Sequence, residues 1–117
     1  MTPIAARELQ SELQKFINRE VYLHLETTNG AYAGEGLTGP KRMNVGAFIR
    51  NARVCFHRAV VAGEGPYRIG LQMQHGWIYA EGLTHWEVDE QDRLLTAGFN
   101  EGRLAVALEI SNTPFPM

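Results

Sequence analysis

The sequence lacks most features that would place it outside ordinary globular proteins. Cys55 is its one cysteine among 117 residues, so a disulfide scaffold is excluded. No apolar run approaches the roughly 18 residues of a membrane-spanning helix, and the N-terminus turns charged at Arg7 with no apolar stretch before it, unlike a secretory signal. A net charge of -2 and a hydrophobic fraction of 44% exclude a disordered chain. We therefore expect one cytoplasmic domain over residues 1–117.

Lysine is also scarce, and the charges are unevenly placed along the chain. Arginine outnumbers lysine by nine to two. Residues 40–74 carry a net charge of about +5 and residues 75–117 one of about -5, counting formal charges at neutral pH. This asymmetry indicates either an anion site or basic strands that pair with acidic neighbours in a sheet, and the second cause is the more common one.

Helical periodicity is confined to the start of the chain. Thr2 and Pro3 suit a helix N-terminus. Apolar residues follow at spacings of three and four, namely Ala5, Leu9, Leu13 and Phe16. We predict a helix over residues 3–18 and an antiparallel β region over residues 20–111, where the period drops to two. The expected turns lie at Asn29-Gly30, Asn51, residues 63–66, His75-Gly76, residues 89–92 and residues 100–102.

This order of elements predicts an α+β, mainly β fold. The N-terminal helix would be followed by a curved antiparallel sheet, or a partly closed barrel, of about seven to eight short strands. The apolar face of each periodic segment predicts the core: Val21, Leu23, Leu25, Tyr67, Ile69, Leu71, Val106 and Leu108, with Leu9, Leu13 and Phe16 packed on it. The glycine-rich segment 34–39 matches a dinucleotide-binding string, but Pro40 follows it and no helix does, so we exclude that function.

Two short pairs of residues raise the possibility of a metal site. His24 and Glu26 are two apart on one predicted strand, and His85 and Glu87 repeat the spacing on another, so each pair faces one side of a sheet. Brought together, the four side chains would suit zinc or another divalent ion. The same spacing is typical of the polar face of a half-buried strand, so we predict no cofactor. Cys55, among apolar neighbours, is expected to be a buried small hydrophobe.

Three arginines form the candidate ligand site. Arg50, Arg58 and Arg68 come from consecutive predicted strands, which are usually neighbours in space. A guanidinium suits bidentate capture of a carboxylate or phosphate, and Tyr32 and His24 would line the same mouth. The alternative is that each arginine pairs with a glutamate of a neighbouring strand. Arg58 points either into a barrel or, through a bulge, outward.

Aromatic residues indicate a partner. Trp77, Trp86 and Tyr79 compete for burial in a small domain with sheet edges to cover, so we predict a homodimer. Nucleic acid and membrane are not expected partners, since the whole chain is slightly acidic and has no apolar span.

Five segments resemble those of the YojF-like family of small uncharacterised bacterial proteins. They are residues 24–33 (HLETTNGAYA), 46–51 (GAFIRN), 62–70 (AGEGPYRIG), 76–85 (GWIYAEGLTH) and 110–115 (ISNTPF). The family has no assigned activity. Its members tend to be encoded beside a deacetylase of the bacillithiol pathway, which implies a role near low-molecular-weight thiol or amino-sugar metabolism.

Together these features favour a non-enzymatic accessory or small-ligand-binding protein that acts with a partner enzyme or a small anionic metabolite. The alternative is a metal-dependent hydrolase of an anionic sugar or thiol metabolite, built on the two His-x-Glu pairs.

Overall fold

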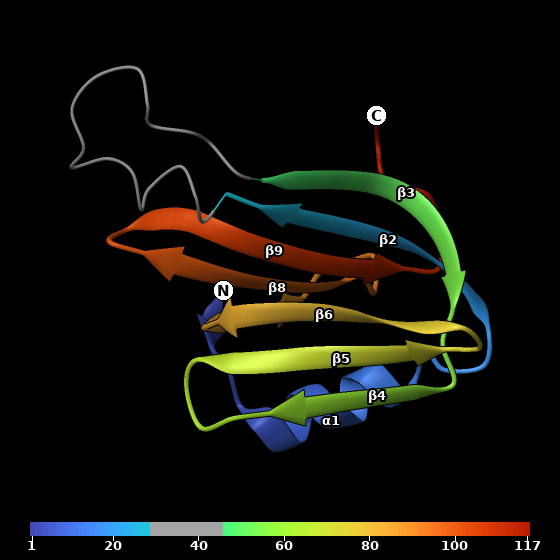
Figure 1. Ribbon diagram of the computed structural model, residues 1–117, viewed down its shortest axis with the longest axis horizontal. Coiled ribbons are helices and arrows are strands. Elements are labelled where there is room, and N and C mark those ends of the chain that lie inside the picture. The colour runs from blue at the N-terminus through green and yellow to red at the C-terminus, as the bar shows by residue number, and fades with distance from the viewer. Residues whose placement is uncertain (29–45) are drawn as a thin grey trace.

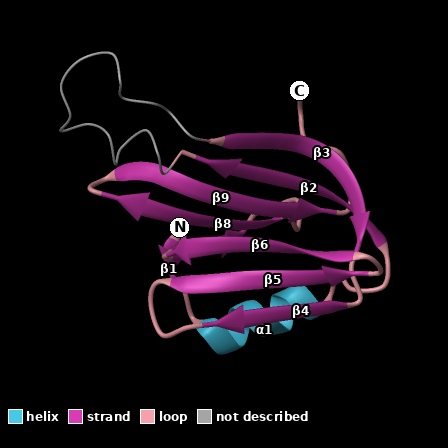
Figure 2. Ribbon diagram, viewed as in Figure 1, coloured by secondary structure: helices cyan, strands magenta, loops and turns pink. Residues whose placement is uncertain are grey.

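The computed structural model describes residues 1–28 and 46–117, and it is built of antiparallel strands around one short helix (Figures 1 and 2). The mainly β prediction is confirmed. The elements are β1 (Thr2–Pro3), α1 (Ala6–Gln14), β2 (Glu20–Thr27), β3 (Ala47–Cys55), β4 (Arg58–Ala62), β5 (Tyr67–Met73), β6 (Gly76–Leu83), β7 (His85–Val88), β8 (Leu94–Asn100) and β9 (Arg103–Ser111).

The strands form two sheets, which corrects the prediction of one curved sheet or a partly closed barrel. The larger sheet has the order β1-β7-β8-β9-β2-β3, and the smaller one has the order β4-β5-β6. The chain leaves the larger sheet at Phe56-His57, between β3 and β4, and returns at Thr84, between β6 and β7. Bends of this kind let neighbouring strands belong to different sheets and leave the assembly open. Figure 1 shows α1 behind β4 and β5.

The predicted turn at Asn51 is a β-bulge inside one long strand. Asn51 has a φ of 59°, and the pairing of β2 with β3 shifts register between Leu23 and Leu25. Asparagine tolerates this left-handed conformation better than most residues, so it absorbs the extra residue without ending the strand. The strand that was predicted to stop at Asn51 therefore runs from Ala47 to Cys55.

The two sheets approach closely where β8 passes β6. A Cβ built on Gly98 would lie 1.9 Å from the carbonyl oxygen of Gly82 and 2.7 Å from a methyl carbon of Val106. No side chain fits there, so glycine is required at position 98 for the sheets to meet. In Figure 1, β8 and β6 run next to each other at this junction.

One hydrophobic cluster joins the helix to both sheets and confirms the predicted core. Its fully buried members include Leu9, Leu13, Val21, Leu23, Ile69, Leu71 and Leu108. Phe16 and Val106 are also buried, and Leu25 and Tyr67 are half-buried against the cluster. The large apolar area removed from water here stabilises the packing of the two sheets on α1.

The helix is shorter than predicted and also protects a sheet edge. It begins at Ala6, because Thr2–Pro3 pairs with β7 as a short strand, and it ends at Gln14, where residues 15–18 turn the chain toward β2. The Gln10 side chain donates a 2.8 Å hydrogen bond to the carbonyl oxygen of Ala59 and accepts a 3.0 Å bond from the Val61 N–H. Gln10 thereby satisfies backbone groups on the open edge of β4, as a neighbouring strand would.

Most of the remaining turns lie where the sequence predicts them. The turns at residues 89–92 and 100–102 are confirmed. The hairpin turn predicted at His75-Gly76 lies one residue earlier, at Gln74-His75, because Gly76 begins β6 and pairs with Met73. Cys55 is exposed, contrary to expectation, because strand alternation turns it away from the core. The loop at residues 34–43 and the Asn29-Gly30 turn lie outside the described residues. In the part of the chain that the structure describes, no helix is long and apolar enough to cross a membrane.

Candidate functional site

His24 and Arg50 are brought together on the outer face of the larger sheet. His24 is 5% exposed. Its Nε2 lies 3.2 Å from Glu26 Oε1, and its Nδ1 lies 3.3 Å from Arg50 Nη1. The Phe48 ring meets the imidazole edge-on, with centroids 5.2 Å apart. Both ring nitrogens of His24 therefore already have partners within the protein.

The C-terminal segment occupies the space beside Arg50. Arg50 donates hydrogen bonds from Nε (3.1 Å) and Nη2 (2.7 Å) to the carbonyl oxygen of Pro116. Its guanidinium lies 5.0 Å from the centroid of Phe115, whose ring is buried. The donors that could hold a carboxylate thus bind a backbone carbonyl. Arg50 and His24 therefore hold the C-terminal segment in place, through Pro116 and Phe115.

The four predicted metal ligands do not converge, which corrects that hypothesis. His24 and His85 share one face of the larger sheet, but β8 and β9 separate their strands. Three strand spacings amount to about 14 Å, well beyond the reach of one ion. His85 Nδ1 is 2.7 Å from Thr84 Oγ1, and Glu87 pairs with the N-terminal amine at 3.0 Å. Within residues 1–28 and 46–117, no group of three potential ligands could hold a metal.

Arg58 and Arg68 lie together on the outer face of the smaller sheet, away from Arg50. Arg58 is exposed, which settles its direction as outward. It lies 6.0 Å from the centroid of the Trp77 ring, and Arg68 lies 5.7 Å from that of Tyr79. The two rings stack on each other, with centroids 5.4 Å apart and planes within 8°. We call the column Arg58–Trp77–Tyr79–Arg68 the ladder.

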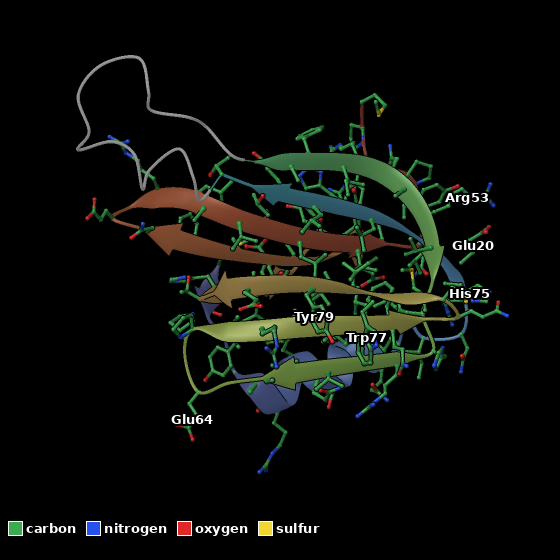
Figure 3. The ribbon with its side chains drawn as sticks, viewed as in Figure 1. Glu20, Arg53, Glu64, His75, Trp77 and Tyr79 are labelled. Atoms are coloured by element: carbon green, nitrogen blue, oxygen red, sulfur yellow. The ribbon has the colours of Figure 1, made fainter. Side chains whose placement is uncertain are left out.

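The strand between the two outer strands makes room for these rings. A Cβ on Gly70 would lie 3.0 Å from a carbon of the Tyr79 ring and 3.4 Å from one of Trp77. The rings therefore lie over the backbone of β5. Tyr79 remains 52% exposed and Trp77 remains 39% exposed. Figure 3 shows Trp77 and Tyr79 side by side on the near face of the smaller sheet.

The ladder carries an excess of positive charge. Neither Arg58 nor Arg68 forms an ion pair with any carboxylate among the described residues, although Glu81 lines a hollow next to Arg68. Glu64 projects from the β4–β5 turn away from the rings (Figure 3). A cation–π contact does not use the N–H donors of a guanidinium, so Arg58 and Arg68 can still bind anions.

Two concave surfaces adjoin the ladder, and a third lies elsewhere on the protein. A shallow hollow of about 180 Å³ lies over Gly70, between Arg58 and Arg68. A groove of about 500 Å³ begins at Tyr79 and follows the junction of the two sheets to Val106 and Thr27. A third cleft, of about 580 Å³, lies between α1 and β7. Of these, the hollow over Gly70 is the one lined by two unpaired cations.

Sequence reasoning found the arginines of the ladder but not their arrangement. Tyr32 lies outside the described residues. The sequence places Trp77 and Tyr79 on one face of a strand, because they are two residues apart. It does not indicate that their rings lie beside Arg58 and Arg68. Gly70 is the one sequence feature that could have indicated this arrangement. It lies opposite Tyr79 in the register and has no side chain, which leaves room for the two rings.

Comparison with known proteins identifies the family. Residues 3–115 match the family model described as "Protein of unknown function (DUF1806)". The chain is 49% identical to the uncharacterized protein YojF of Bacillus subtilis (strain 168) over 116 residues, which cover 98% of both chains. It is also similar to the crystal structure of Bacillus subtilis YojF, with a TM-score of 0.82, 45% identity and coverage of 99% of this chain and 97% of that one. The resemblance noted in the sequence is thus confirmed, and the chain belongs to the DUF1806 family.

Proposed function

We propose that this protein is a non-enzymatic cytosolic accessory protein that binds an anionic partner on the ladder. The observation that carries the proposal is the pairing of two exposed arginines with two exposed, stacked aromatic rings. Neither cation has a carboxylate partner among the described residues, whereas Arg50 is occupied by the C-terminal segment. Exposed aromatic residues and arginines are the residue types enriched at binding surfaces.

The hydrolase alternative has no comparable support. It depended on joining the His24–Glu26 and His85–Glu87 pairs around one ion, and those pairs lie on strands that are not neighbours. The gene neighbourhood of the YojF-like family suggests a setting in thiol or amino-sugar metabolism. In that setting the anionic partner is either a small metabolite or an acidic part of a partner enzyme.

Isothermal titration calorimetry at low salt tests the proposal. The probes are inorganic phosphate, succinate, glucosamine 6-phosphate and poly-glutamate, and the variants are Arg58→Gln and Arg68→Gln. Arg7→Gln is the matched control, because it removes the same charge from an exposed position of α1. We expect at least one probe to bind, each ladder variant to weaken it at least threefold, and added salt to weaken it further. If no probe binds, or if Arg7→Gln weakens binding as much as the ladder variants, the proposal is wrong.

A further inference from the structure

The two arginines of the ladder stand at well-separated positions on the smaller sheet. Arg58 lies opposite Gln72 in the register of β4 and β5, and Arg68 lies opposite Ala62. The two arginines are therefore four residues apart along the strands, which places their Cα atoms about 14 Å apart. The Arg58 guanidinium lies near the Trp77 ring, the Arg68 guanidinium lies near the Tyr79 ring, and the two rings stack on each other. A partner that carries two anionic groups at a matching distance can therefore contact both cations.

The shape of this surface favours a macromolecule over a small metabolite. The hollow between the two arginines measures about 180 Å³, whereas pockets that enclose a small ligand usually measure about 300 Å³ or more. Its floor is the backbone of Gly70, and its walls are side chains on the outer face of the three-stranded sheet. A shallow face of this kind suits an extended chain that lies across it.

Charge and hydrophobicity indicate what such a chain would present. Along the ladder it would meet Arg58 and Arg68 together with the exposed parts of the Trp77 and Tyr79 side chains. A complementary segment has acidic groups at its ends and an apolar group at its centre. Extended peptides meet this requirement, because alternate side chains face the same side at about 3.4 Å per residue.

We propose that the ladder binds an extended acidic segment of a partner protein, in which two carboxylates four residues apart contact Arg58 and Arg68. Four residues of extended chain span about 14 Å, which matches the separation of the Cα atoms of Arg58 and Arg68. The residue midway between the carboxylates faces the same side and lies over Trp77 and Tyr79, so we expect an apolar residue or proline there. This inference rests on the proposed function, since it names the partner of the same surface.

Peptides that differ only in the spacing of two glutamates test the inference. We would synthesise three capped peptides of identical composition, neutral apart from two glutamates placed two, four or six positions apart. A fourth peptide carries a single glutamate. Affinity is measured by calorimetry at low salt. We expect the four-residue spacing to bind at least fivefold more tightly than the other three peptides, because the second carboxylate then binds at high effective concentration.

Variants assign the spacing preference to the ladder. In Arg58→Gln and in Arg68→Gln, the peptide whose glutamates are four positions apart should bind no more tightly than the single-glutamate peptide. Arg7→Gln should retain the preference for the four-position spacing. Gly70→Ala changes no charge, yet it places a methyl group 3.0 Å from the Tyr79 ring, so it should also weaken the preference. A thermal unfolding curve for each variant shows whether it is folded.

The outcomes separate this inference from the proposed function. If all three spacings bind with equal affinity and Arg58→Gln weakens that binding, the inference that one segment spans both arginines is wrong. The proposal that the ladder binds anions would stand. Failure of every peptide and of poly-glutamate would overturn both. Tighter binding of glucosamine 6-phosphate, or of a single-stranded oligothymidylate, would replace the peptide by a metabolite or a nucleic acid. A dimer in sedimentation analysis that dissociates on Tyr79→Ala would replace it by a second copy of this chain.

Discussion

The side chain of Asn51 pairs with both backbone polar groups of Phe115, as a strand residue would. Its amide Nδ2 donates to the carbonyl oxygen of Phe115 at 2.8 Å, and its Oδ1 accepts from the Phe115 N–H at 2.7 Å. The same residue forms the bulge of β3. The bulge therefore aims a side-chain amide at the C-terminal segment, and the segment in turn covers Arg50 and His24.

Asn51→Gly tests this attachment without straining the backbone, since glycine accepts the φ of 59°. The variant loses both hydrogen bonds to Phe115, so we expect the free energy of unfolding to fall by about 1–2 kcal/mol. Urea unfolding measures it. Asn112→Gly, at an exposed position of the same segment, is the control. Equal stability of the two variants would show that the amide pair contributes nothing.

Gln10→Ala should expose the edge of β4. The variant leaves the Ala59 carbonyl and the Val61 N–H without their side-chain partner, and we expect a loss of about 1–2 kcal/mol in unfolding free energy. Ser11→Ala, on the exposed side of the same helix, should change it by less than about 0.5 kcal/mol. A Gln10→Ala protein as stable as Ser11→Ala would contradict the role assigned to this glutamine.

Gly98→Ala should be far more damaging than alanine at another strand glycine. Its methyl group would overlap the Gly82 carbonyl oxygen, so β8 and β6 would have to move apart. Overpacking of this kind costs about 1–3 kcal/mol or more. Gly76 has no atom within 4 Å of an added Cβ, so Gly76→Ala is the matched control. Thermal midpoints that fall equally in both variants would refute the close approach of the two sheets.

Asp89 predicts an acid-dependent component of stability. Burial is the largest single influence and raises the pKa of Asp89, but hydrogen bonds from the Arg93 backbone and side chain and from the Gln91 N–H together lower it below its ordinary value. The unfolded state therefore takes up a proton first as the pH falls. The stabilisation is fully present above the ordinary aspartate pKa of about 4, and it is lost as the pH falls through the lower pKa of the folded state.

The measurement is the unfolding free energy of wild type and Asp89→Asn as a function of pH. We expect the variant to be less stable at neutral pH, with the difference shrinking below about pH 4. A difference that is constant down to the lowest pH would contradict the lowered pKa. Glu90→Gln, at an exposed position of the same turn, controls for the change of charge.

The fold was predictable where apolar and polar side chains alternate along a strand. Leu23, Ile69 and Leu108 sit on the apolar side of alternating segments, and each is buried as expected. The division into two sheets was not predictable, because it depends on bends at Phe56-His57 and Thr84, and none of these three residues is a glycine or a proline. The sequence predicts a turn at Asn51, whereas the structure has a bulge there. Both structures can place an asparagine in the left-handed conformation, so the residue type does not distinguish them.

The candidate site was predictable in its residue types and not in its geometry. Arg50, Arg58 and Arg68 come from consecutive strands, yet β3 belongs to one sheet and β4 and β5 to the other. His24 and His85 face the same side of one sheet, but the chain order does not show that two strands lie between them. Strand order is set by long-range pairing, which local patterns do not encode.

Binding at the ladder, the central claim, is tested most directly by the indole N–H signals of the two tryptophans in a two-dimensional NMR titration with poly-glutamate. Trp77 lies within the ladder, whereas Trp86 is half-buried against the hydrophobic cluster. We predict a saturable shift of the Trp77 signal that is lost in the Arg58→Gln, Arg68→Gln double variant, with no shift of Trp86. An unchanged Trp77 signal, or equal shifts of both signals, would contradict the assignment of the ladder as the binding surface.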